Sequence, residues 1–371
     1  MRHEKTVCGL WVVAGLMVLL SACGGGGSGD TRPLSGPVQG ARILGMDVKE
    51  IPSVTYAMAY DQAMALGVRE VSLSLDWALL EPSLGNYDNT LPAIINVFYP
   101  MQAGDVTLVL RPLDTPGPSL PADLAGRAYD DPAVIAAFEA FLSNLHAQLP
   151  ELNASGKLRW IHIGNEIDAW LGADAARWGQ WRTFFRAARA QVRSLWGNSV
   201  QVGSIIQFPV LMDATQSALY ATLVADLDIA VLTYYPLNAD FTMRPVSTVA
   251  DDFALMSSAL AGKTIFLQEC GYPSSTTNNS SLAQQAEFIS AVFSAWDTYA
   301  DRIRLIDIAW QYDVSDTQVD QWVNDFGMAG DPNETAFRAY LGSLGLSNFD
   351  ATEKPALQRL REELVARNWG S

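Results

Sequence analysis

Eight short, mostly apolar runs alternate with helical patterns along most of this 371-residue chain. The runs cover residues 41–47, 70–77, 106–111, 158–165, 200–206, 228–235, 263–269 and 303–310. Strict alternation predicts an α/β fold with a parallel sheet, because parallel neighbours need a crossover connection, which is usually a helix. Eight such units in about 310 residues predict a closed (β/α)8 barrel of the TIM type, in a single domain. An open, doubly wound sheet is the alternative.

Several of the expected helices carry clear end signals. Asp131 is a good N-cap, and Pro132 suits the first helical position. Ser281 and Gln284 have the spacing of a capping box. Residues 353–368 predict one further amphipathic helix after the eighth unit. The barrel domain is therefore expected to cover residues 40–371, with this extra helix at its C-terminal end.

Residues 1–22 have the pattern of a secretory signal peptide. Two basic residues precede the apolar run Leu10–Leu20, which is too short for a stable membrane span. The run ends in Leu-Ser-Ala followed by Cys23, which resembles the bacterial lipobox. That resemblance implies that Cys23 is lipidated and becomes the first residue of the mature protein. An ordinary signal peptide that happens to contain a cysteine is the alternative.

A glycine-rich stretch follows directly and predicts a flexible tether over residues 23–39. We therefore expect a lipoprotein in the bacterial cell envelope, facing the periplasm or the exterior. Its contact with the membrane would be made only through the lipid on Cys23. The expected folded domain is a monomer.

Charge and composition exclude several functions. The net charge is −16, and removal of residues 1–22 makes it −17. A surface this acidic repels nucleic acid and anionic lipid, so a neutral substrate fits better. With three cysteines and three histidines, and no His-x-x-x-His or Cys-x-x-Cys pair, we expect neither a metal site nor a disulfide scaffold. We expect no cofactor.

Polar and aromatic side chains collect where the expected strands end. These ends are Asp76-Trp77, Leu110-Arg111, Gly164-Asn165-Glu166, Tyr234-Tyr235-Pro236, Gln268-Glu269 and Trp310-Gln311. In a barrel of this type the carboxyl ends of the strands form one face, where active sites lie. Period-two alternation places Ile161 and Ile163 toward the helices, and His162 and Glu166 toward the barrel axis.

Glu166 and Glu269 are the main candidates for catalysis. Each ends an apolar strand, where an isolated carboxylate is costly to bury. Two carboxyl groups about 5–5.5 Å apart can cleave a glycosidic bond with retention, one as acid/base and one as nucleophile. The alternative is that each is a solvated residue at the start of a loop.

The motifs around these residues resemble glycoside hydrolase clan A, a group of retaining (β/α)8 enzymes. Residues 163–166, Ile-Gly-Asn-Glu, resemble its acid/base signature, and residues 267–274, Leu-Gln-Glu-Cys-Gly-Tyr-Pro-Ser, resemble its nucleophile strand. The latter is close to the family 17 β-1,3-glucanases. Residues 233–236, Thr-Tyr-Tyr-Pro, resemble the family 53 endo-β-1,4-galactanases. Residues 77–88 resemble the loop after strand two in many clan members.

The resemblance implies roles for individual residues. Glu166 would be the acid/base and Glu269 the nucleophile, and Asn165 would bind the sugar 2-hydroxyl. Tyr235, or else Tyr234, would donate to the nucleophile.

Four helper residues have a second interpretation. Trp310 would stack under the sugar, or it could be barrel packing. Arg111 would lower the nucleophile's pKa, or it could pair with Asp76 or Asp114 for structure alone. Trp77 and Trp170 could be sugar platforms, or could simply lie in loops.

These observations predict a retaining glycosidase that cleaves a neutral β-linked glycan. A non-catalytic barrel that binds glycans or builds the envelope is the alternative. A transglycosylase on the same scaffold is a variant of the first class.

Overall fold

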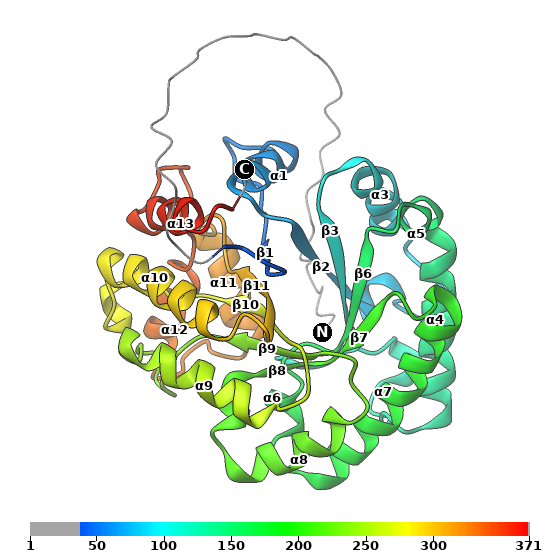
Figure 1. Cartoon of the computed structure of the whole chain (residues 1–371). Coiled ribbons are helices and arrows are strands. Elements are labelled where there is room, and N and C mark those ends of the chain that lie inside the picture. The colour runs from blue at the N-terminus through cyan, green and yellow to red at the C-terminus, as the bar shows by residue number, and fades with distance from the viewer. Residues whose placement is uncertain (1–37, 370–371) are drawn as a thin grey trace.

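The computed structural model describes residues 38–369, which form one α/β domain around a parallel sheet (Figure 1). Nine strands build the sheet: β1 Ile43–Met46, β2 Glu70–Asp76, β3 Asp105–Arg111, β6 Leu158–Ile163, β7 Gln201–Gly203, β8 Ile205–Gln207, β9 Ala230–Tyr234, β10 Ile265–Cys270 and β11 Ile303–Ile308. Their spatial order is β7-β6-β3-β2-β1-β11-β10-β9-β8. A two-stranded hairpin, β4 Leu113–Asp114 and β5 Gly117–Pro118, follows β3.

The sheet is a nearly closed barrel. Its two edge strands, β7 and β8, are consecutive in the chain, and only Ser204 separates them. β7 pairs in parallel with β6, whereas β8 pairs in parallel with β9. Counted as one interrupted strand, β7 and β8 correspond to the run expected at residues 200–206. The expected TIM-type barrel in a single domain is therefore confirmed.

Helices surround the strands (Figure 1). The α-helices are α1 Tyr56–Leu66, α2 Trp77–Leu80, α3 Thr90–Phe98, α4 Pro132–Gln148, α5 Pro150–Ser155, α6 Asp168–Leu171, α7 Ala175–Trp196, α8 Ala214–Val224, α9 Val249–Ala259, α10 Leu282–Thr298, α11 Asp316–Asp325, α12 Glu334–Leu341 and α13 Pro355–Ala366. The 3-10 helices are η1 Tyr99–Met101, η2 Ala122–Leu124, η3 Phe208–Leu211, η4 Val246–Thr248 and η5 Thr276–Asn278.

The expected helix ends are present. Asp131 caps α4 by accepting a hydrogen bond from the backbone N–H of Ala133. Ser281 caps α10 in the same way through the N–H of Gln284. The extra helix expected at residues 353–368 is α13, which packs against α10.

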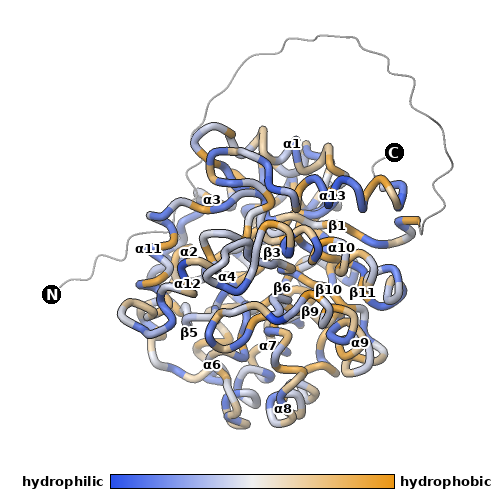
Figure 2. Tube along the Cα trace, turned by 90° about the vertical axis from the view of Figure 1, so that its left-hand side faces the viewer, coloured by the Kyte–Doolittle hydropathy of each residue, from blue (hydrophilic) through white to orange (hydrophobic). Residues whose placement is uncertain are grey.

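Apolar side chains pack on both sides of the sheet. Ile161 and Ile163 belong to the large core between strands and helices, as alternation along β6 predicts. Trp160 belongs instead to a small cluster with Phe266 and Leu305, residues that alternation places inside the barrel. In Figure 2, strands β6, β9 and β10 lie in the middle of the fold, and the surrounding helices alternate between hydrophilic and hydrophobic segments, as amphipathic helices do.

The expected signal peptide (residues 1–22), Cys23 and all but the last two residues of the expected tether (23–39) lie outside the described residues. Within residues 38–369, no helix combines the length and hydrophobicity that a membrane crossing needs.

Candidate active site

The backbone turns sharply where β6 ends, and this turn places Glu166. Gly164 has φ 79°, and Glu166 itself has φ 43°, in the left-handed region that few non-glycine residues adopt. A Cβ on Gly164 would lie 2.5 Å from Ile167 Cγ2 and 2.6 Å from Trp181 Cζ2. Glycine is therefore required at position 164, and the unusual φ at Glu166 marks a constrained position of the kind found at functional sites.

Three side chains hold the Glu166 carboxyl group. Thr233 Oγ1 donates to Oε1 at 2.7 Å, and Thr115 Oγ1 donates to Oε2 at 2.7 Å. Gln207 Nε2 also donates to Oε2, at 3.1 Å. Because a threonine hydroxyl can accept as well as donate, Glu166 keeps hydrogen-bond partners both with and without its proton. An acid/base residue needs this property.

Glu269 is placed by an irregularity in β10. Leu267 pairs with Leu232, and Glu269 pairs with the next residue along β9, Thr233, so one extra residue, Gln268, is inserted. This bulge interrupts the plain alternation of a regular strand. The Glu269 carboxylate accepts a hydrogen bond from the Tyr235 hydroxyl, 2.7 Å from its Oε2.

The two glutamates interact electrostatically. Burial, followed by repulsion from Glu166, raises the pKa of Glu269 to about 8. Burial also raises the pKa of Glu166, against the donors that favour its charged form. Buried carboxyl groups that repel each other in this way tend to share a proton near neutral pH. The raised pKa of Glu269 runs against the expectation that Arg111 keeps it low.

Arg111 lies at the end of β3 between two other carboxylates. Its guanidinium forms ion pairs with Asp76 at 3.4 Å and with Asp114 at 3.1 Å. Asn165 donates to the same Asp114, at 2.9 Å from Nδ2 to Oδ1. Arg111 therefore forms the ion pairs with Asp76 and Asp114 that the structural interpretation of the sequence named. It also orients Asn165, because both side chains contact Asp114.

Only one of the two adjacent tyrosines contacts Glu269. Tyr235 does so, as noted. Tyr234 is fully buried on the other side of β9 and donates to Asp252 Oδ2 at 2.9 Å. Asp252 is also the partner of Arg244, so Tyr234 belongs to the packing between the barrel and α9.

Trp310 follows β11 at the mouth of the barrel and is 8% exposed. The Lys49 ammonium lies 3.7 Å from the centre of its ring, and the Trp322 ring lies 5.4 Å away. Lys49 also pairs with Asp47, 3.0 Å away. A sugar could stack on this face of Trp310 only if Lys49 moved aside.

Trp77 and Trp170 are both held by neighbouring side chains. Trp77 has no exposed surface, donates to Glu81 and packs on Phe138 with ring centres 4.9 Å apart, so its expected role as a sugar platform is wrong. Trp170 is half-buried, and the Arg177 guanidinium lies 4.4 Å from its ring centre.

Several site residues were not found by sequence reasoning. Thr115 and Gln207 hold Glu166 from the β4–β5 hairpin and from the end of β8, and Thr233 holds it from β9. Tyr340, on α12, packs edge-on against Tyr235 with ring centres 5.5 Å apart. Of these, Gln207 directly follows the strand expected at residues 200–206, and Thr233 lies within the one expected at 228–235.

A second group of polar side chains is buried inside the barrel, one step from the site toward the amino ends of the strands. It contains Glu70, Asp307, His162 and Gln268, none more than 3% exposed. Burial raises the pKa of Glu70 to about 8 and lowers that of His162 to about 3, so all these groups tend to be neutral. A side chain at Gly45 would collide with Glu70, so glycine makes room for the pair of acids.

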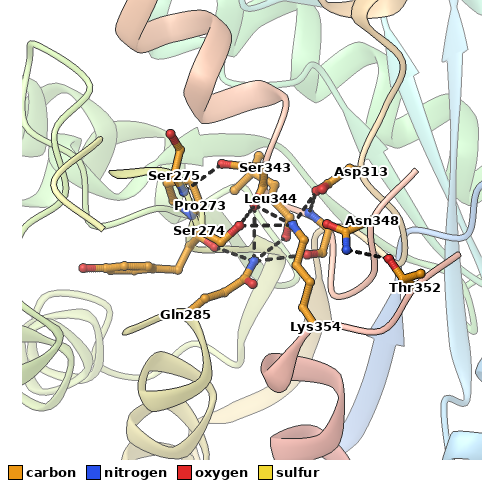
Figure 3. A network of polar contacts seen from close by, with 12 residues as sticks. Pro273, Ser274, Ser275, Gln285, Asp313, Ser343, Leu344, Asn348, Thr352 and Lys354 are labelled. Atoms are coloured by element: carbon orange, nitrogen blue, oxygen red, sulfur yellow. Dashed lines mark hydrogen bonds and ion pairs between the residues drawn. The ribbon is translucent and has the colours of Figure 1, made fainter. Parts of the chain in front are cut away.

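Buried polar side chains anchor the loop after β10, which contains the Gly-Tyr-Pro-Ser sequence of residues 271–274 (Figure 3). Buried Lys354 donates to Ser274 Oγ and to Asp313 Oδ1, at 3.2 and 2.7 Å. Gln285 donates to the carbonyl oxygens of Tyr272 and of residues 343–345. These contacts tie the loop that carries the motif to the C-terminal segment.

Among residues 38–369 no cluster of three or more His, Cys, Asp or Glu side chains has the arrangement of a metal site.

Comparisons with known proteins show the same fold in glycoside hydrolases. A GH5_18 protein from Bifidobacterium longum, solved with Manβ1-4GlcNAc, superposes with TM-score 0.65 at 16% identity, over 89% of this chain and 79% of that one. The GH53 catalytic domain of Ignisphaera aggregans gives 0.60 at 16% identity, over 89% and 98%. The exo-β-1,4-mannosidase Op5Man5 from Opitutaceae bacterium strain TAV5 gives 0.63 at 16% identity, over 91% and 62%.

No protein-family model and no curated protein sequence matches the chain. At these identities the likeness concerns the fold alone, a TIM barrel that this chain shares with these glycoside hydrolases.

Proposed function

We propose that this protein is a retaining glycoside hydrolase that cleaves a neutral β-linked glycan. The observation that carries the proposal is the pairing of Glu166 and Glu269 at the ends of β6 and β10. Each ends a strand at the same face of the barrel, both are half-buried, they interact electrostatically, and each has its own hydrogen-bond donors. The shared fold of clan A glycosidases supports the same conclusion.

The reaction would proceed in two displacements. In the first, the Glu269 carboxylate attacks the anomeric carbon while Glu166 gives its proton to the leaving oxygen. In the second, Glu166 takes a proton from water, the resulting hydroxide attacks the same carbon, and the bond to Glu269 breaks. Tyr235 would hold Glu269 in line for the attack, through the hydrogen bond to Oε2.

A neutral glycan suits the charge around the site. Asp47 and Asp114 lie near Glu269, and the nearby cations are already paired: Lys49 with Asp47, and Arg111 with Asp114 and Asp76. An anionic sugar would therefore meet net repulsion. Among the proteins of this fold, the GH5_18 protein solved with Manβ1-4GlcNAc makes a neutral β-linked disaccharide a natural first substrate to try.

The decisive experiment is a substrate screen with analysis of product stereochemistry. Purified protein would be assayed on β-galactan, β-1,3-glucan, β-1,4-mannan, xylan and Manβ1-4GlcNAc, and the first-formed anomer read by NMR. We expect cleavage of at least one substrate with retained configuration. A 2-deoxy-2-fluoro glycosyl fluoride of the same sugar should label Glu269 covalently, which mass spectrometry of peptides would detect.

Other outcomes identify the alternatives. Binding to a glycan without turnover would support a non-catalytic barrel, and products longer than the substrate would identify a transglycosylase. An inverted product would contradict the double displacement. The control is Glu287→Gln, which removes an exposed carboxylate on α10 and should keep the wild-type activity.

We further propose that the enzyme is a lipoprotein of the bacterial cell envelope, held through Cys23. This proposal rests on the lipobox-like run and the glycine-rich stretch that follows it.

A further inference from the structure

We propose that a cavity beside Tyr235 is the subsite for the leaving-group sugar, and that it accepts an uncharged pyranose ring. The inference rests on the proposed glycosidase function and goes beyond it, because it names the cavity that binds the sugar on the leaving-group side of the bond.

The cavity lies beside Tyr235, the hydrogen-bond partner of Glu269. Its volume is about 350 Å³, and Tyr235 and Phe208 are part of its wall. The Tyr235 hydroxyl donates to Glu269, and Phe208 directly follows Gln207, whose side chain donates to Glu166. One side chain in the wall therefore contacts the proposed nucleophile, and another is next in sequence to a residue that contacts the proposed acid.

The order of strands places the cavity on one side of the scissile bond. Its lining comes from the segments after β8 and β9, whereas Trp310 and Lys49 follow β11 and β1. Because β10, which carries Glu269, lies between β9 and β11, these two groups are on opposite sides of the nucleophile. Once Lys49 moves aside, Trp310 would offer an aromatic surface for the glycone, and the cavity is then left for the leaving group.

The size and the lining suit a sugar ring. A volume of about 350 Å³ lies at the small end of the range for ligand pockets, which is roughly 300–1,000 Å³. Leu237 and Met212 supply apolar surface for the C–H face of a pyranose. Met212 is 55% exposed, so its side chain is accessible to a ligand in the cavity. Asn238 supplies polar atoms for ring hydroxyls.

The charges in the lining select against acidic sugars. Arg244 is the one cation there, and both of its terminal nitrogens donate to the buried Asp252, at 2.9 Å each. Its charge is therefore balanced. Asp213 adds a carboxylate, whose side chain also caps α8 through the N–H of Gln216. The net charge facing the ligand is negative, so a uronate ring would be repelled and a neutral ring accepted.

The first test separates the leaving group from the rest of the reaction. Two probes share one glycone. The first is an oligosaccharide of two to four sugars, chosen as the one that the wild type cleaves fastest among β-1,4-manno-, β-1,4-galacto-, β-1,3-gluco- and β-1,4-xylo-oligosaccharides. The second is the corresponding β-glycosyl fluoride. Fluoride is too small to use the cavity. Met212→Trp should fill the cavity and lower the ratio of kcat/KM, oligosaccharide over fluoride, by about tenfold or more.

The matched control is Met101→Trp, the same change at a methionine that is 76% exposed on η1, before β3. It should keep the wild-type ratio. An unchanged ratio in Met212→Trp would overturn the subsite. If the wild type cleaves neither probe, the failure lies in the proposed function itself.

The second test addresses charge. Asp213→Asn removes the carboxylate but keeps a good N-cap for α8. With the same glycone linked to a glucuronate or to a neutral sugar, the wild type should prefer the neutral leaving group. Asp213→Asn should reduce that preference at least threefold. An unchanged preference would show that Asp213 does not face the leaving group.

Discussion

Gly271 lies directly against the ring of Tyr235, so close that a side chain at this position would displace the tyrosine. A Cβ on Gly271 would lie 2.6 Å from Tyr235 Cε1 and 2.7 Å from the carbonyl oxygen of Ala309. Since Tyr235 donates to Glu269, the glycine two residues after Glu269 controls the partner of that carboxylate. This contact gives a physical reason for a glycine within the Glu-Cys-Gly sequence.

Replacing Gly271 by alanine should therefore damage both stability and catalysis. Overpacking of this kind costs about 1–3 kcal/mol of unfolding free energy. A displaced Tyr235 should lower kcat on the order of 10²-fold, because small misplacements at a reacting centre have large effects. Urea denaturation and steady-state kinetics would measure the two effects.

Gly179→Ala is the matched control for that substitution. Gly179 lies inside α7, and a Cβ there would meet no atom within 4 Å. It should stabilise the protein by about 0.5–1 kcal/mol and leave kcat unchanged. Equal effects of the two substitutions would contradict the contact between Gly271 and Tyr235.

The two glutamates should respond differently to azide. Glu269→Ala should abolish turnover, and azide should restore it with an inverted product. Glu166→Ala should lower the rate on natural glycans by about 10²–10⁴-fold, spare aryl glycosides with good leaving groups, and give a retained product with azide. The anomer of each glycosyl azide would be read by NMR. Exchanged outcomes would reverse the roles, and wild-type rates in both variants would exclude the pair.

Tyr235→Phe should shift the pH dependence of the reaction. The hydroxyl of Tyr235 lowers the pKa of Glu269, so its loss should raise that pKa further and move the acid limb of the kcat/KM profile to higher pH. A hydrogen bond to a charged group is worth about 1.5–3 kcal/mol, so kcat should also fall by about 10- to 100-fold. Tyr234→Phe is the control, because Tyr234 bonds Asp252 instead; it should keep the acid limb in place.

Stability should fall between pH 6.5 and 8. Burial raises the pKa of Glu70 and of Glu269 from 4.5 to about 8, so the folded state holds protons in this range that the unfolded chain has released. Stability then decreases as pH rises, by at most about 1.4 kcal/mol per pH unit for each group. His162, whose pKa falls from 6.5 to about 3, acts in the opposite sense, but its contribution is largely complete by pH 6.5.

Glu70→Gln should flatten this slope, because the amide is neutral at every pH. Denaturation in urea at pH 6.5, 7.2 and 8 would measure it, with the surface variant Glu287→Gln expected to keep the wild-type slope. Identical slopes in Glu70→Gln and the wild type would show that Glu70 does not hold a proton in the folded state.

Cys23→Ser should release the protein from membranes or block its processing, because the sulfur atom of Cys23 would carry the lipid. Fractionation of cells that express each form, followed by mass spectrometry of the mature N-terminus, would test this. A variant that stays membrane-bound and normally processed would disprove the anchor.

The sequence alone determined the barrel and the main candidates for catalysis. Strand and helix patterns depend on local periodicity and end signals, which is why α4, α10 and α13 were foreseen near their observed bounds. The positions of Glu166 and Glu269 followed as well, because the carboxyl ends of all barrel strands meet at one face.

Only the tertiary structure decided what each side chain contacts. The partners of Glu166 come from a hairpin and from two other strands, and the bulge that places Glu269 depends on register against β9. Trp77 looked like a site residue because it ends a strand, yet it turns into the core on α2. Such contacts depend on packing between segments far apart in the chain, and local sequence patterns carry no record of that packing.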